Sequence, residues 1–266
     1  MKNPTSRGRR TGSSLAAVAA ICLFPTVSAA AAASPQDVHE MADVCMYSQR
    51  VLKDYPLIGM GVDYRDPAGD LAASSKLVDR YLANIESHGL KQELDAEVRE
   101  IEVAWKRIEP QLMASPTKEK MAELQPLVDS FAHRCGEVAD HLAKDTGIAA
   151  EHEVLLIATL GMEVQRLAAL YVMKAWGVPD DRYYEKVAEV LREYEEIYAE
   201  LMAADERQVP AEVKVRLKEA EQHFLVFEVM AASKSGRFVP TLAEKKASEL
   251  FAEIREILKL EEALVE

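Results

Sequence analysis

The stretch MADVCMYSQRVLKDYPLIGMGV, residues 41–62, decides the fold because a similar stretch, IATLGMEVQRLAALYVMKAWGV, occupies residues 157–178. Seven of the 22 aligned positions are identical, more than unrelated segments of ordinary composition share. The identical pairs are Ala42/Ala158, Met46/Met162, Gln49/Gln165, Arg50/Arg166, Tyr55/Tyr171, Gly61/Gly177 and Val62/Val178. Recurrence at an offset of 116 residues indicates a duplicated structural unit.

The N-terminus has the features of a secretory signal peptide. Four basic residues precede an apolar run at 15–27, and small residues follow at 28–33. The apolar run is shorter than a transmembrane helix. We therefore predict that residues 1–33 form a signal peptide and that the mature protein is soluble in the periplasm.

The charge of the mature chain excludes some partners. Removing the four basic residues of 1–33 from a total of 32 leaves 28 basic against 45 acidic residues, a net charge of −17. Nucleic acid is disfavoured as a partner because its phosphates require a basic surface. The most apolar later stretch, 154–178, contains Glu163, Gln165 and Arg166, so no membrane anchor is expected.

The composition indicates an all-α fold. Ala, Leu, Glu, Lys, Met and Arg dominate, and alternating runs of β-branched residues are missing from the sequence. Prolines, glycines and capping residues separate the expected helices at roughly 35–59, 70–88, 91–113, 117–145, 149–176, 181–206, 211–233 and 241–264.

Short loops between these long helices favour antiparallel packing of neighbours. We therefore predict two tandem up-and-down four-helix bundle units, residues 34–147 and 148–266, related by internal duplication. The sequence leaves open whether the two units pack end to end or side by side.

Two cysteines, Cys45 and Cys135, remain after removal of the signal peptide, and export would place them in an oxidising compartment. If the first and fourth helices are antiparallel, Cys45 faces Cys135 and His39 faces His141. A shared metal site is one alternative, but six residues of helix separate the two layers by roughly 9 Å, too far for one tetrahedral ion. We favour a disulfide, with two free buried thiols as the other alternative.

Motifs of common enzymes and cofactor sites are missing. The sequence contains no HExxH, no CxxCH, no ExxH pair of the di-iron type, no GxSxG and no phosphate-binding glycine loop. Its many acidic residues are at helical spacing, where they most often form a solvated face. We therefore expect no enzymatic activity, no cofactor and no metal site.

The repeated Gln-Arg pair has two interpretations. Each arginine can bond an acidic residue of its own helix, Arg50 to Asp54 and Arg166 to Glu163, as an ordinary ion pair. These acidic residues occupy different offsets in the two copies, whereas Met, Gln, Arg and Tyr recur. A shared role in helix packing or in binding an anion explains the recurrence better. The candidates for ligand contact are Gln49, Arg50, Gln165 and Arg166.

The stretch MYSQR at 46–50, its apolar continuation to Tyr55 and the later Trp-Gly-Val at 176–178 resemble a known motif. It is the AGRQRMLSQR-type helix in the periplasmic N-terminal domain of type IV pili methyl-accepting chemotaxis transducers. That domain is related to the sensor region of nitrate/nitrite histidine kinases. The resemblance implies a helical bundle with the motif on the first helix of each unit. The matching residues are Met46, Ser48, Gln49 and Arg50 in the first copy and Met162, Gln165 and Arg166 in the second.

The sequence also differs from this family. In the nitrate sensors an arginine just before the motif's methionine contacts the anion across a dimer, and here that position is Cys45 in one copy and Gly161 in the other. The transducers continue through a membrane helix into a signalling module, which this sequence lacks.

From the resemblance and these differences we expect a stand-alone periplasmic sensor-like binding protein. It would recognise a small ligand, with a small anion as one option, or dock to a membrane-bound sensor or chemoreceptor-type protein, and a homodimer is one expected arrangement. The alternative is a helical interaction or scaffold protein of the cell envelope with no small ligand.

Overall fold

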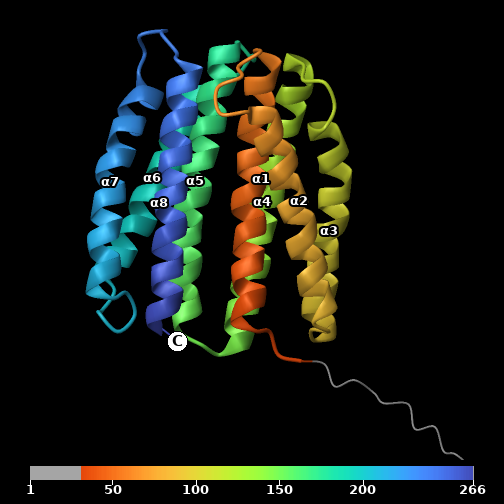
Figure 1. The fold of residues 1–266 in the computed structure, drawn as a ribbon, viewed down its shortest axis with the longest axis vertical. Coiled ribbons are helices and arrows are strands. Elements are labelled where there is room, and N and C mark those ends of the chain that lie inside the picture. Colours follow the sequence, from red (N-terminus) through yellow and green to blue (C-terminus); the bar gives the residue numbers. More distant parts are fainter. Residues whose placement is uncertain (1–30, 266) are drawn as a thin grey trace, which may run out of the picture.

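The structure is a computed structural model that describes residues 31–265, so nearly all of the predicted signal peptide, residues 1–33, lies outside the described residues. Within residues 31–265 the chain forms eight α-helices and no strand (Figure 1), which confirms the all-α prediction. The helices are α1 (Pro35–Gly59), α2 (Pro67–Ser87), α3 (Gln92–Leu112), α4 (Lys118–Thr146), α5 (Ala150–Trp176), α6 (Tyr183–Ala203), α7 (Ala211–Ala232) and α8 (Pro240–Val265).

Local sequence signals set the helix ends. The Ser34 side chain accepts a hydrogen bond from the backbone of Asp37, and the Asp37 carboxylate accepts one from the backbone of Ser34, so a capping box begins α1. Gly147 ends α4 and Gly177 ends α5, with φ values of 70° and 76° that favour glycine. The chain reverses direction at Gly147, so α4 and α5 are antiparallel neighbours.

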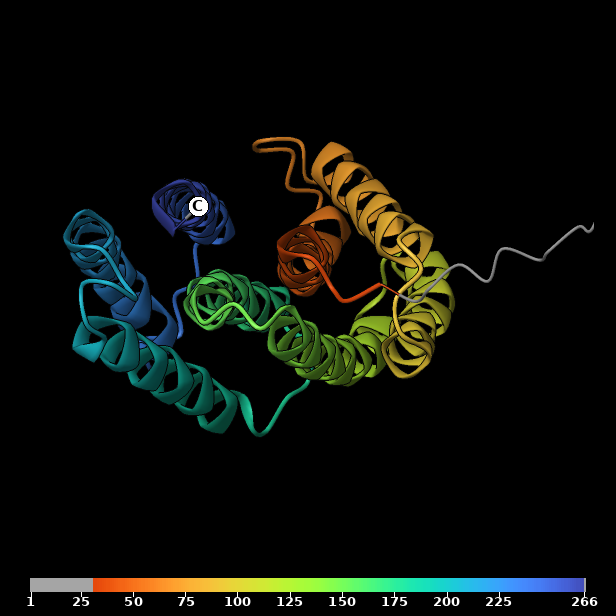
Figure 2. The same cartoon turned by 90° about the horizontal axis from the view of Figure 1, so that it is seen from below.

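Helices α1 and α5 are at the centre of the molecule. Helix α1 packs against α2, α4 and α5, and α5 packs against α1, α6 and α8. Helix α3 packs against α2 and α4, and α7 packs against α6 and α8. In Figure 2, α2, α3 and α4 lie on the α1 side of the central pair, and α6, α7 and α8 lie on the α5 side. The two halves of the chain therefore pack side by side through α1 and α5.

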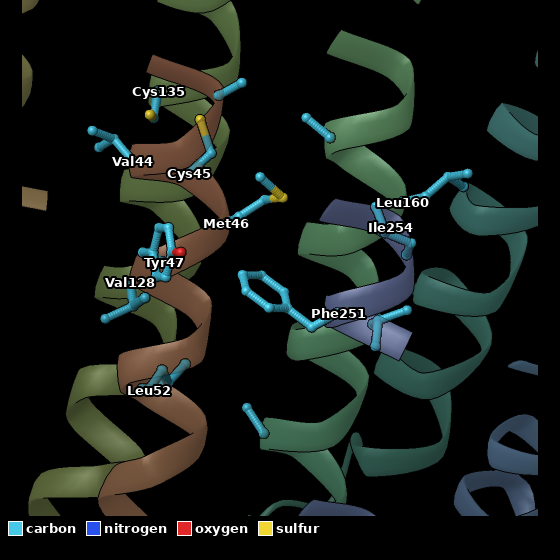
Figure 3. Packing of buried hydrophobic residues seen from close by; sticks show 14 of the residues in the cluster. Val44, Cys45, Met46, Tyr47, Leu52, Val128, Cys135, Leu160, Phe251 and Ile254 are labelled. Carbon is cyan, nitrogen blue, oxygen red and sulfur yellow. The ribbon is translucent and has the colours of Figure 1, made fainter. Parts of the chain in front are cut away.

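The contact between α1 and α5 uses small side chains. A Cβ atom added at Gly161 of α5 would lie 2.8 Å from Met46 Sδ, so the methionine of α1 occupies the space that the glycine leaves. Ala42 and Ala158 are also buried. Figure 3 shows Met46 extending from α1 toward α5. Small residues let the two helix backbones approach closely, which fixes the positions of the other six helices.

Helix α5 is the one helix of the described residues that is long and apolar enough to cross a membrane, with a mean hydropathy of 1.4 over 18 residues. Of that window, 72% is buried inside the fold. Its apolar residues serve as packing surface for α1, α6 and α8.

The predicted disulfide between Cys45 and Cys135 is wrong for this structure, because both are free, buried cysteines. The facing positions were correct, since the two side chains meet between α1 and α4 (Figure 3). Both thiols donate hydrogen bonds to the carbonyl oxygen of Met41, at 3.2 and 3.3 Å. Burial also raises the pKa of the Cys135 thiol, which disfavours the thiolate needed for disulfide exchange.

A cluster of charged side chains is buried where α1 meets α8. Lys53 Nζ lies 2.9 Å from Asp54 Oδ1 and also pairs with Glu244 of α8, and all three side chains are almost fully buried. Ser248 donates a hydrogen bond to Glu244 at 2.5 Å. Burial raises the pKa of Asp54 to about 7, although the charge of Lys53 opposes the shift. One cation therefore faces two carboxyl groups, of which Asp54 is partly protonated near neutral pH.

We expect the free energy of unfolding to fall as pH rises from about 4 to about 7, with Asp54 as one cause. Its carboxyl group has a pKa of about 7 in the folded protein and about 3.8 in the unfolded chain, so only the folded protein holds this proton in that window. Urea titrations between pH 4 and pH 8 measure the slope. The Asp54→Asn variant should show a smaller slope, and an unchanged slope would contradict this assignment.

Candidate functional site

The predicted site residues divide between two faces of the central helix pair. Gln49 of α1 and Arg166 of α5 meet at Asp129 of α4: Gln49 Nε2 donates to Asp129 Oδ1 at 3.0 Å, and Arg166 Nε lies 3.9 Å from Asp129 Oδ2. The structure therefore brings together one residue from each copy of the repeat.

The other two predicted residues lie near α8. Gln165 Nε2 donates to the carbonyl oxygen of Ala247 at 3.1 Å. The Arg50 guanidinium lies 5.2 Å from the centre of the Phe251 ring and 2.7 Å from Asp70 Oδ2. Gln165 and Arg50 thus contact α8 and are not part of the arrangement around Asp129.

A cavity of about 420 Å³ opens beside Asp129, between α4, α5 and α6 with α1 beneath. We call it the acidic cavity. Its polar lining consists of Gln49, Asp129, His133, Thr159, Glu163, Arg166, Glu189 and Glu193.

A second cavity of about 300 Å³ adjoins the first between α4 and α5. We call it the apolar cavity, and its lining includes Cys45, Gly136, Leu155, Leu156 and Ala158. Ala132, His133, Thr159 and Met162 line both cavities, so the two are continuous. Together they form the α4/α5 groove, which has one acidic half and one mostly apolar half, although Glu137 and Asp140 also line the apolar cavity.

The acidic half carries an excess of negative charge. The Arg166 guanidinium lies 2.8 Å from Glu193, 3.4 Å from Glu163, 3.8 Å from Glu189 and 3.9 Å from Asp129. Burial raises the pKa of Glu163 to about 8 and raises that of Asp129, while Arg166 opposes both shifts. Because Glu163 is largely protonated near neutral pH, Arg166 faces the carboxylates of Asp129, Glu189 and Glu193, and the charge of Lys186 also acts on Asp129. The remaining excess of negative charge makes this half of the groove attractive to positive charge.

Gln49 has an unused hydrogen-bond acceptor in this site. The side chain is 1% exposed, its amide nitrogen is engaged by Asp129, and its Oε1 atom has no partner in the described part of the chain. A buried amide oxygen without a partner is unfavourable. Its presence in the lining of a cavity is a feature expected of a ligand-binding site.

Sequence reasoning missed the acidic residues of the groove, which are Asp129 on α4 and Glu189 and Glu193 on α6. Acidic residues at helical spacing were expected to form solvated faces. A signal was nevertheless present, because Asp129 lies between the apolar positions Val128 and Ala132 of an amphipathic helix. An acid on the edge of a buried stripe indicates a partner on another helix.

No known protein family matches the chain, and no characterised protein or solved structure is detectably similar to it. The resemblance to the sensor domain of chemotaxis transducers therefore stays a prediction. Within residues 31–265 no group of three or more histidine, cysteine or acidic side chains is placed to hold a metal ion.

We expect Arg166→Gln to destabilise the protein by about 2 to 4 kcal/mol, because it leaves the buried carboxyl groups of Glu163 and Asp129 without their cation. Urea unfolding measures the change. The double variant with Glu163→Gln should recover part of the loss in a double-mutant cycle.

The matched control is Arg216→Gln, which breaks an exposed ion pair with Glu219 on α7. It should change stability by less than about 0.5 kcal/mol. An equal effect of the two arginine variants would contradict the structural role assigned to Arg166.

Proposed function

We propose that this protein is an exported sensor-like binding protein that holds a small ligand in the α4/α5 groove. The observation that carries the proposal is that Gln49 and Arg166 line the same cavity, and that the side-chain oxygen of Gln49 has no hydrogen-bond partner among residues 31–265. The two cavities of the groove have the volume of a site for a small molecule.

A small anion is less well supported as the ligand. Arg50 is paired with Asp70, and Arg166 is surrounded by carboxyl groups. An anion would have to displace an acidic partner from either arginine. Contact of a small anion with these arginines stays a prediction.

We also propose that the eight helices form two four-helix bundle units that arose by duplication. Helices α2 and α6 begin and end 116 residues apart, the same offset as the repeat. Five buried positions of the two helices correspond at this offset. The pairs are Pro67/Tyr183, Leu71/Val187, Ser74/Val190, Val78/Tyr194 and Ile85/Leu201.

Equivalent tertiary contacts support the same proposal. The Tyr55 hydroxyl accepts a hydrogen bond from the backbone N–H of Thr117, just before α4, at 3.4 Å. The Tyr171 hydroxyl accepts one from the backbone N–H of Val239, just before α8, at 2.9 Å. Each recurring tyrosine thus contacts the residue just before the last helix of its own proposed unit. This packing role explains why the tyrosine recurs.

A second candidate function, a helical interaction protein, is favoured by the surface of α7. Three exposed apolar side chains of α7 lie close together: Leu225 is 47%, Val226 is 53% and Val229 is 72% exposed. Leu225 and Val226 are neighbours in sequence, and Val229 lies about one helical turn further along. An exposed apolar patch on a helix is typical of a protein-binding surface. It would serve equally for docking of the proposed sensor to a membrane-bound chemoreceptor-type partner.

We expect a thermal-shift screen of anions, amines, amino acids and dicarboxylates to give a ligand that stabilises the protein. A ligand at 100 times its dissociation constant adds about 2.7 kcal/mol, which is a shift of several degrees for a chain of this size. Gly136→Leu should abolish the shift, because Gly136 lines the apolar cavity, a Cβ added there meets nothing within 4 Å, and the larger side chain takes up part of the cavity.

The control for this screen is Gln165→Ala, whose side chain lies against α8 and outside the groove. It should keep the ligand-induced shift. A screen without any stabilising compound would remove the support for a ligand site and leave the interaction protein as the better proposal.

For the interaction function, we expect a photo-crosslinking residue at Val229 to join the protein to one envelope partner in cells that produce it. The same residue at Glu119, on an exposed position of α4, is the control. Equal products at both positions would contradict a specific docking surface on α7.

A further inference from the structure

We infer that the α4/α5 groove takes an organic cation, an ammonium group carried on an aliphatic chain, an inference that rests on the proposed ligand-binding function. The acidic cavity presents four carboxyl groups against the single guanidinium of Arg166. An added cation reduces this imbalance, whereas an added anion increases it.

The opposite face of the central pair shows that helix packing does not require these acids. Tyr47 occupies the position 116 residues before Glu163, and Phe251 of α8 corresponds to Asp129 of α4 at an offset of 122 residues. Tyr47 and Phe251 pack edge to face with ring centres 5.5 Å apart (Figure 3). Aromatic side chains thus occupy these positions on one face, whereas the equivalent positions on the other face carry carboxyl groups that line a cavity. The cavity of the first face, about 340 Å³, is lined by other residues, among them Met46 and Arg255.

Helices α2 and α6, the second helices of the two halves, show the same contrast between apolar and acidic residues. Glu189 and Glu193 of α6 correspond to Ala73 and Leu77 of α2 at the offset of 116 residues. Two acids therefore replace two apolar residues on the side that contains the cavity. The charge is concentrated at one place and is not a general property of the repeat.

The unpartnered oxygen of Gln49 identifies the kind of cation. An ammonium group has three N–H donors and can bond Gln49 Oε1 and carboxylate oxygens at the same time. A quaternary ammonium group has no such donor and would leave the amide oxygen unpaired. Within residues 31–265 the acids do not form a metal-binding group, so an organic ammonium fits better than a metal ion.

The apolar cavity supplies the space for the aliphatic part. It shares Ala132, His133, Thr159 and Met162 with the acidic cavity and extends to His152. Its lining is mostly apolar but also includes Glu137 and Asp140. From His152 to Arg166 the groove follows α5 for roughly 21 Å at 1.5 Å per residue. A chain of several methylene groups can therefore extend along α5 with its ammonium group at the acidic end.

The test is isothermal titration calorimetry of the purified protein with hexylamine, ethylamine, hexanol and hexanoate at low salt. We expect hexylamine to bind at least tenfold more tightly than hexanol or hexanoate. The affinity should rise roughly three- to fourfold for each methylene group added between ethylamine and hexylamine.

Variants separate the two halves of the site. The double variant Glu189→Gln/Glu193→Gln should weaken hexylamine binding by roughly five- to thirtyfold, while Arg166 keeps Glu163 and Asp129 as partners. Its control, Glu195→Gln/Glu196→Gln, removes two charges from the exposed side of the same helix and should leave the affinity unchanged.

Gly136→Leu should abolish the gain in affinity with chain length without disturbing the fold, because leucine is a better helix former than glycine. The control Ala122→Leu lies on an exposed position of the same helix and should have no effect. Hexylamine binding that survives both groove variants unchanged would overturn the proposal.

The outcomes distinguish this inference from the proposed function. Hexanoate binding as tightly as hexylamine, or a different stabilising compound whose effect is lost in Gly136→Leu, would overturn the ligand class and keep the binding site. Failure of every compound to bind would overturn both.

Discussion

The structure depends on the close contact between α1 and α5. Gly161 leaves the space that Met46 fills, and alanines at 42 and 158 keep the two backbones near each other. Each of these helices carries the second and last helices of its own half, so their contact places all eight helices. Because both central helices are surrounded, their polar residues must find partners on other helices, and this requirement produces the ion pairs and hydrogen bonds found around α4 and α8.

Burial of polar groups has different consequences on the two faces of this central pair. Near α8, Lys53, Asp54 and Glu244 form a closed cluster, and Arg50 stacks on Phe251. Near α4, Arg166 is shared among several carboxyl groups beside a cavity, and an oxygen of Gln49 lacks a partner in the described residues. Both faces have a cavity and unpartnered polar atoms, since Gln165 Oε1, Arg50 Nε and the Asp54 oxygens near α8 also lack a hydrogen-bond partner in the described residues. The second face differs because its unpartnered oxygen belongs to Gln49, which lines a cavity rich in carboxyl groups, and this is the physical basis for placing a ligand there.

Several features were predictable because they depend on local sequence. The cap at Ser34 and the terminal glycine at 177 mark helix ends through backbone geometry that neighbouring residues determine. The facing positions of Cys45 and Cys135 followed from helix lengths and antiparallel packing. Disulfide formation did not follow, because it depends on the distance and orientation of the two sulfur atoms in the tertiary structure, and here both cysteines are free and donate to the Met41 carbonyl.

The sequence by itself determined the helical class, the positions of the eight helices and the recurrence of Gln49 and Arg50 as Gln165 and Arg166. Only the tertiary structure decided that the halves pack side by side and that Gln49 meets Arg166 instead of its neighbour Arg50. The reason is physical: capping and periodicity act over a few residues. The composition of a groove depends on which helix faces are brought together across more than one hundred residues of chain.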